Sequence, residues 1–161
     1  MPDCTIRRIQ KEDNEVLANI IRRAFEEFKV NTAGTVYEDP TTDDLYSLFD
    51  RTDAVCWVAA IESAVVGCAG IYPTEGLPAG CCEFVKFYLA PSARGKGVGG
   101  ALMNICITSA KELGYTHIYL ESFPAFSKAI GLYTRAGFYP LRAPLGNSGH
   151  FGCTIWMMKA L

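Results

Sequence analysis

The feature that most constrains this chain is a strand that runs into a glycine-rich turn and then into a helix. Alternating aromatic and β-branched residues favour a strand over residues 84–89, and Pro91 prevents its continuation as a central strand. Four glycines follow between Gly95 and Gly100, so the backbone there can adopt positive φ and approach a ligand closely.

This turn is predicted to bind an anion. The first N–H groups of a helix have no intrahelical partner and lie at the positive end of its dipole. Arg94 and Lys96 add two positive charges at this point. A phosphate or pyrophosphate suits such a site, whereas a plain solvated turn gains nothing from so many glycines beside two cations.

Composition excludes several classes of protein. The 161 residues, 50% of them hydrophobic, are enough for one globular domain, expected over residues 1–161. A net charge of −2 and scattered basic residues argue against a nucleic-acid partner. The chain shows neither a signal-like apolar run at its start nor a membrane-spanning segment, so we expect a cytoplasmic protein. Seven cysteines without a C-x-x-C spacing predict no disulfide framework and no metal site.

The order of the predicted elements indicates an α+β fold. Strands are predicted over residues 5–9, 54–61, 65–72, 82–89, 117–121, 138–141 and 154–158. Helical spacing predicts helices after Asp13, after a cap at Thr41 or Thr42, after the glycine turn and over residues 126–136. Short connections make the early strands an antiparallel meander, and the helix after the turn makes a parallel crossover. We expect a mixed sheet of six or seven strands flanked by about four helices.

A dinucleotide-binding oxidoreductase is one interpretation of the turn. Residues 95–100 satisfy G-x-G-x-x-G, and Glu121 ends the next strand, where such folds place an acid for the ribose. Three features disfavour it. Five residues separate the strand from the first glycine, a meander precedes the motif, and too few residues follow Glu121 for a second half of such a fold.

Two motifs together resemble the GNAT superfamily of N-acetyltransferases. The sequence R-G-K-G-V-G over residues 94–99 is similar to the acetyl-CoA signature R/Q-x-x-G-x-G/A of that family. The sequence L-Y-T-R-A-G-F over residues 132–138 resembles its second signature, L-Y-x-x-x-G-F. The resemblance implies a GNAT-like domain that transfers acetyl from acetyl-CoA to a primary amine.

The resemblance also implies how acetyl-CoA is held. Main-chain amides of the turn would bind the pyrophosphate, Arg94 would order the loop, and the backbone of the preceding strand would pair with pantetheine. The implied cofactor-binding residues are Phe87, Tyr88, Leu89, Arg94, Gly95, Lys96, Gly97, Val98, Gly99 and Gly100. One position departs from the family, because Phe126 stands where many members have an asparagine that contacts CoA.

Two residues match catalytic positions of the family. Glu83, eleven residues before Arg94, stands where some members have a general base, and Tyr133 matches the general-acid tyrosine. The competing interpretation of Glu83 is a residue on a solvated face beside Lys86, and that of Tyr133 is a core aromatic residue. No cysteine has a neighbour that would lower its pKa, so a covalent route is disfavoured.

The acceptor is the least constrained part of the prediction. Residues 29–42 and 142–153 form loops that we expect to select it, with His150 as one candidate contact. An acidic cluster in the first of these segments and just beyond it suits either a cationic substrate or a solvated surface: Glu38, Asp39, Asp43 and Asp44. We expect a small-molecule amine or amino acid, with a protein amine next. A non-catalytic CoA-binding sensor is the alternative function, and a homodimer is left open.

Overall fold

The computed structural model describes residues 3–161, whose strands form one sheet in the order β1-β2-β3-β4-β5-β7-β6. The strands are β1 (Cys4–Arg8), β2 (Val55–Ile61), β3 (Ala64–Tyr72), β4 (Cys81–Leu89), β5 (His117–Ser122), β6 (Tyr139–Pro140) and β7 (Ile155–Ala160). Strands β4 and β5 are parallel, and the other neighbouring pairs are antiparallel. The predicted mixed sheet is confirmed, with seven strands.

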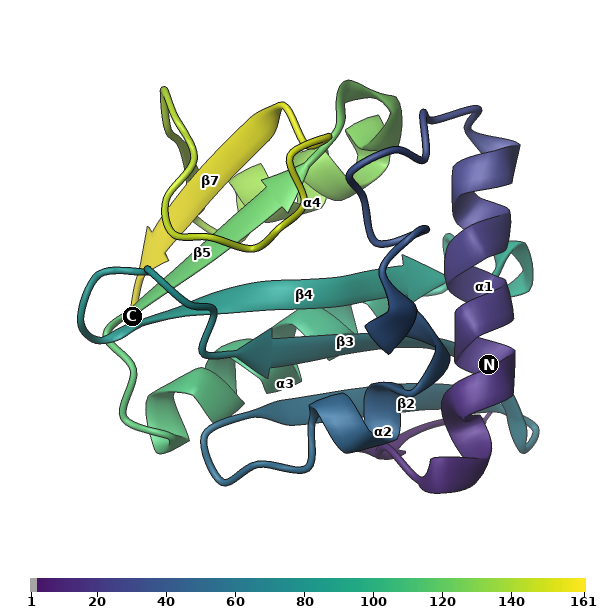
Figure 1. Ribbon diagram of the computed structural model, residues 1–161. Helices are drawn as coiled ribbons and strands as arrows, with labels where there is room; N and C mark the ends of the chain where they lie inside the picture. Colours follow the sequence, from purple (N-terminus) through teal and green to yellow (C-terminus); the bar gives the residue numbers. More distant parts are fainter. Residues whose placement is uncertain (1–2) are drawn as a thin grey trace.

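Helices cover both faces of this sheet (Figure 1). They are α1 (Asn14–Glu27), α2 (Leu45–Leu48), α3 (Val98–Glu112) and α4 (Ser127–Arg135), and short 3-10 turns precede several of them. Helices α1 and α2 pack on one face, while α3 and α4 pack on the other. This arrangement confirms the predicted α+β class. Within residues 3–161, no helix combines the length and the apolar character needed to cross a bilayer.

The sheet separates two hydrophobic clusters, because successive side chains of a strand point to opposite faces. On the first face, Leu17, Ile21 and Phe25 of α1 are fully buried against the sheet. On the second face, the buried side chains of α3 and α4 include Leu102 and Tyr133. The apolar stripes expected from helical spacing therefore form the core.

The predicted helix caps need correction. Asp13 immediately precedes α1, but its carboxylate accepts hydrogen bonds from the Arg7 guanidinium and the Gln10 amide instead of capping the helix. Asp44 caps α2 by accepting from the Ser47 amide, so neither Thr41 nor Thr42 is its cap. The hydroxyl of Thr42 instead donates to the backbone carbonyl of Val36.

Two irregularities of β4 shape the site. First, β4 pairs with β5 only from Cys81 to Glu83, and beyond that point the two strands diverge (Figure 1). Second, β4 has a bulge, because pairing with β3 moves from Val85↔Gly70 to Tyr88↔Cys68. Lys86 lies in this bulge with a φ of 58°. Bulges of this kind redirect side chains and occur often near active sites.

Candidate active site

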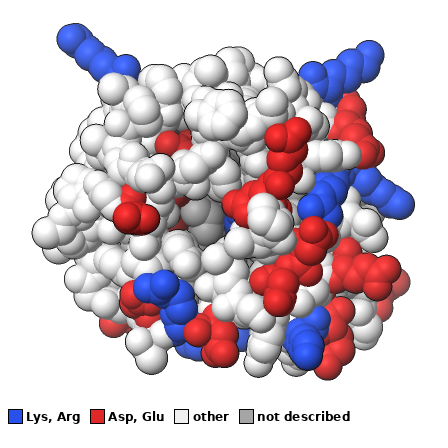
Figure 2. Space-filling view, in the orientation of Figure 1, with Lys and Arg blue, Asp and Glu red and all other residues white. Residues whose placement is uncertain are grey.

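A cleft of about 580 Å³ opens where β4 and β5 diverge. It is lined by β4, the glycine turn, the end of β5, helix α4 and the two loops that were expected to select the acceptor. Figure 2 shows a hollow near the centre of one face of the molecule, with acidic side chains beside it. The predicted site residues that line the cleft are Glu83, Phe87, Tyr88, Leu89, Arg94, Gly95, Gly97, Gly99, Gly100 and Tyr133.

The glycine turn presents free backbone donors at the start of α3. The amides of residues 95–100 donate no hydrogen bond to any other part of residues 3–161. Gly95 and Gly97 have φ values of 73° and 80°, a conformation that side chains with a Cβ rarely adopt. These N–H groups lie at the positive end of a helix of 15 residues. Such a cradle fits the pyrophosphate of a coenzyme.

The glycines of the turn have different roles. A Cβ at Gly95, Gly97 or Gly100 would meet no atom within 4 Å, so open space lies beside each of them. A Cβ at Gly99 would lie 3.2 Å from Phe87, so this glycine also permits close packing of α3 on β4. Two of the predicted coenzyme-binding residues of the turn do not line the cleft. Lys96 is exposed at the surface, and the side chain of Val98 is buried in the core.

Arg94 ties the turn to the end of β4. Its Nε and one terminal nitrogen lie 3.3 and 3.1 Å from the carbonyl oxygen of Leu89, to which they donate. The other terminal nitrogen donates to Glu27 at 2.8 Å, and the guanidinium lies over the ring of Phe28. Arg94 therefore connects the turn, β4 and α1.

Glu83 is a buried carboxylate at the point where β4 and β5 separate. Only 4% of the residue is exposed, so the interpretation that it lies on a solvated face is wrong. Its Oε1 accepts a hydrogen bond of 2.6 Å from the Thr74 hydroxyl. Burial, helped by the negative charge of Glu121, raises the pKa of Glu83 to about 7. A carboxylate with that pKa is suited to accept a proton near neutral pH.

Tyr133 of α4 lines the cleft from the opposite side of the sheet. Its ring packs against Phe84, Phe87 and Phe138, with centroids 6.0 to 6.1 Å away. Only 6% of the residue is exposed, yet its hydroxyl is not among the fully buried atoms: it reaches the cleft and forms no hydrogen bond within residues 3–161. Burial raises the pKa of this phenol, so it stays protonated and can donate. The residue is thus both a core aromatic and a lining residue.

Phe126, which stands where many family members have an asparagine, is part of the cleft wall. Its ring packs edge-on against Phe25, Phe28 and Tyr88, and it lines the cleft. Any contact from this position to a ligand is therefore a contact with a hydrocarbon ring.

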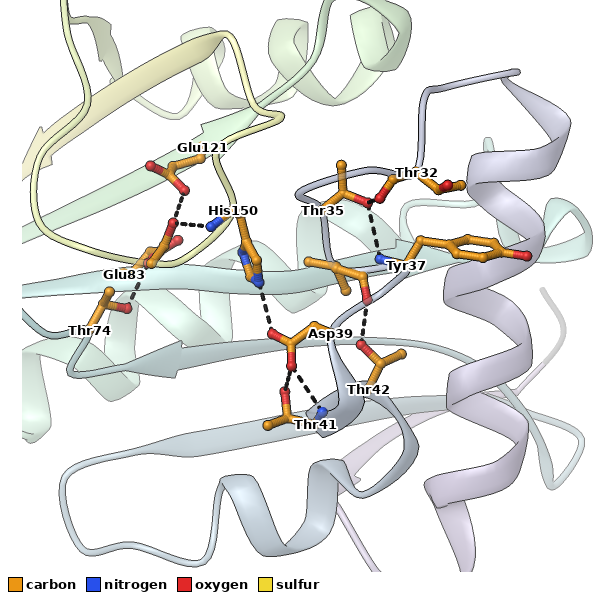
Figure 3. A network of polar contacts seen from close by, with 12 residues as sticks. Thr32, Thr35, Tyr37, Asp39, Thr41, Thr42, Thr74, Glu83, Glu121 and His150 are labelled. Carbon is orange, nitrogen blue, oxygen red and sulfur yellow. Dashed lines mark hydrogen bonds and ion pairs between the residues drawn. The ribbon is translucent and has the colours of Figure 1, made fainter.

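Polar residues gather on the acceptor side of the cleft, and two of them, Glu121 and Lys86, were not predicted to contact the acceptor. Figure 3 shows Glu83 and His150 in front of β4, with Glu121 on the β5 side of them and Asp39 on the β3 side. Glu121 accepts from the Ser148 and Tyr119 hydroxyls, and His150 pairs with Asp39 at 2.9 Å. Lys86 also lines the cleft and is only 5% exposed. The described residues include no cluster of three His, Cys, Asp or Glu side chains suited to a metal ion.

Glu121 could have been recognised from the sequence, because the strand that it ends was predicted to be parallel in the same sheet. It was considered only as a ribose ligand. Asp39 was considered only as a member of an acidic cluster, and its pairing with His150 depends on a loop conformation. Lys86 carried no signal, since its position depends on a strand bulge that no local pattern marks.

A cleft with free helix-terminal amides, a buried carboxylate and a phenol suits an enzyme that transfers a group from a phosphate-bearing coenzyme. Residues 15–138 match the acetyltransferase (GNAT) family. The chain belongs to this family, and the predicted resemblance is confirmed.

A relative supports this assignment, and solved structures share the fold. The chain is 34% identical over 157 residues to an uncharacterized N-acetyltransferase, YjgM, of Escherichia coli, covering 97% of this chain and 94% of that one. An acetyltransferase of the GNAT family from Staphylococcus aureus superposes with a TM-score of 0.85 at 20% identity, covering 99% of each chain. The PaiA N-acetyltransferase of Thermoplasma acidophilum, solved with coenzyme A, gives a TM-score of 0.79 at 18% identity, covering 99% of each chain.

Proposed function

We propose that this protein transfers the acetyl group of acetyl-CoA directly to the primary amine of a small molecule or an amino acid. The observation that carries this proposal is the placement of the buried Glu83 carboxylate in the same cleft as the free amides of residues 95–100. One end of the cleft suits a coenzyme pyrophosphate, and the other has a group that can remove a proton. A protein amine is the second acceptor class. We expect the enzyme to act in the cytoplasm.

Main-chain groups on two sides of the cleft would hold acetyl-CoA. The turn amides would bind its pyrophosphate, and β4 from Phe87 to Leu89 would pair with the pantetheine arm at the edge that β5 leaves free. Arg94 would keep the turn in place through the Leu89 carbonyl, and Phe126 would offer an apolar contact. The coenzyme supplies an activated thioester.

Glu83 and Tyr133 would solve the two proton problems of the reaction. Glu83, or a water that it holds, would take a proton from the acceptor ammonium and so free the nitrogen lone pair for attack. The new C–N bond then forms while the C–S bond breaks and its electron pair passes to sulfur. Tyr133 would give its phenolic proton to that sulfur. The proton left on the new amide nitrogen restores the phenol through solvent, so one proton is released overall.

Two binding measurements test the ligand class. We expect saturating acetyl-CoA to raise the melting temperature of the protein by about 5 °C or more, and NAD to leave it unchanged, since only a ligand of the native state stabilises it. Stabilisation by NAD alone would restore the oxidoreductase interpretation.

Release of free thiol from acetyl-CoA across a panel of amines then tests turnover. We expect release with at least one small amine or amino acid, together with the corresponding N-acetyl product. Tight acetyl-CoA binding with no acetyl transfer to any small or protein amine would identify a CoA-binding sensor instead of an enzyme.

A further inference from the structure

The cleft contains a buried cation that the protein leaves without a partner. Lys86 is 5% exposed and lines the cleft. Within residues 3–161, its ammonium takes part in neither a hydrogen bond nor an ion pair. Since none of the fully buried side-chain nitrogens of these residues lacks a partner, the ammonium reaches the open space of the cleft. A largely buried cation that faces a cleft without a partner is placed to bind an anionic ligand, because pairing offsets the cost of its burial.

The bulge of β4 is what brings Lys86 into the acceptor side of the cleft. In a regular strand, Glu83 and Lys86 would point to opposite faces, because side chains alternate. The extra residue in β4 shifts this alternation by one, so that Lys86 joins the face of the sheet that carries Glu83 and Tyr88. Its backbone has a φ of 58°, which is unfavourable for a residue with a side chain. The fold therefore holds an unusual backbone conformation at a buried cation.

The neighbouring carboxylates do not neutralise Lys86 by direct contact. Asp39 accepts hydrogen bonds from Thr41 and pairs with His150, while Glu83 accepts from Thr74 (Figure 3). Burial lowers the pKa of Lys86, and the negative charges of both carboxylates oppose that shift through space without reversing it. Each carboxylate thus has its own partners, and the ammonium has none.

We propose that Lys86 binds a carboxylate of the acceptor, so that the acceptor is an amino acid with its ammonium group at Glu83 and its carboxylate at Lys86. This inference rests on the proposed acetyl transfer and narrows its acceptor. The cleft offers opposite charges to the two ends of such a molecule: carboxylates at Glu83 and Glu121 for the ammonium, and an unpaired cation for the carboxylate. An amine without an acid would leave Lys86 buried and unpaired in the complex.

Pairs of acceptors that differ only in the carboxylate distinguish binding of that carboxylate by Lys86 from a purely structural role of Lys86. Each amino acid of the panel is compared with its own carboxamide, which keeps the amine and the side chain but lacks the negative charge. We expect the wild-type kcat/KM to be about 10 to 100 times higher for the acid than for the amide, the range of a hydrogen bond to a charged group.

The variant Lys86→Met keeps an unbranched side chain that is one atom shorter and removes its charge. We expect it to lose about 10 to 100-fold in kcat/KM for the acid and little for the amide, so that the two acceptors become equivalent. Lys86→Arg should retain a preference for the acid. Lys111→Met, at an exposed position of α3, serves as the matched control and should behave as wild type. Equal losses for acid and amide in Lys86→Met, or no preference in the wild type, would overturn the proposal.

Product binding keeps this test independent of turnover. If no amine is acetylated, the proposed function fails, but calorimetric titration of an N-acetyl amino acid and its amide in the presence of CoA still tests Lys86. Tighter binding of the acid that is lost in Lys86→Met supports the site. Equal binding of both compounds to the wild type contradicts it.

Discussion

At the scale of single residues, the chemistry depends on burial. Glu83 and Tyr133 have common side chains whose pKa values in water are ordinary for their type. In the folded protein, both are largely shielded from water by the core around them. Burial disfavours the charged form of each, so their pKa values rise. The consequence differs between the two, because a carboxyl group near pKa 7 can exchange protons at neutral pH, whereas a phenol with a raised pKa remains a proton donor.

Tyr133→Phe tests the donor directly. The substitution removes only the hydroxyl, which has no hydrogen-bond partner within residues 3–161, so the packing against Phe84 and Phe138 should persist. We expect kcat to fall about 100-fold, a typical contribution of general acid catalysis, while the Kd for acetyl-CoA changes less than about twofold. Stopped assays and calorimetry provide the two numbers. Unchanged turnover would assign Tyr133 to packing alone.

At the scale of elements, the glycine turn and α3 form the coenzyme end of the cleft. Their positions could be predicted, because the glycines, the proline and the helical stripe all carry local signals. The roles of individual glycines could not, since they depend on what lies opposite each one. Gly99 faces Phe87, while Gly100 faces open space.

Gly100→Ala uses this difference. Gly100 has no positive φ and a Cβ there meets nothing within 4 Å, so the fold should be kept. The added methyl group would occupy the space beside the free amides, and we expect the Kd for acetyl-CoA to rise about tenfold. Gly131→Ala in α4, which lies outside the cleft lining, is the matched control and should leave that Kd unchanged. An unaltered Kd in Gly100→Ala would mean that the coenzyme does not approach the turn closely.

The strand β4 could be predicted from the sequence, but the bulge within it could not. The alternation of residues 84–89 predicts a strand, and the strand is present. The sequence gives no sign that β4 advances by three residues while β3 advances by two, because this irregularity is set by pairing with another strand. For this reason Glu83 could be predicted as a site residue and Lys86 could not.

At the scale of the whole molecule, two loops distant in sequence meet over the acceptor side of the cleft. The amide of Gly152 donates to the carbonyl of Gly34 at 2.9 Å, and His150 pairs with Asp39 across the same junction. These loops, residues 29–42 and 142–153, were expected to select the acceptor, and both contribute residues to the lining. Their mutual contacts were beyond prediction, since His150 and Asp39 are 111 positions apart and no periodic pattern links them.

The fold as a whole was more predictable than the site. The antiparallel meander, the parallel crossover and the four flanking helices follow from patterns that extend over many residues, and all are confirmed. The acceptor side is built from single polar residues on loops and on a bulge, where each position depends on tertiary contacts. The coenzyme end could therefore be inferred from sequence, and the selection of the acceptor required the structure.

The pH dependence of kcat/KM tests the central claim most directly, since that claim makes Glu83 the base that receives the amine's proton. Only the ionised carboxylate can act, and its pKa is raised to about 7, so the rate should rise with pH through a midpoint near 7. Glu83→Gln keeps an acceptor for the Thr74 hydroxyl but cannot take a proton. We predict that this variant loses the midpoint near 7, falls about 100-fold or more below the wild type at neutral pH, and recovers partly at high pH, where the free amine is abundant. A Glu83→Gln enzyme with the wild-type profile and rate would contradict the account.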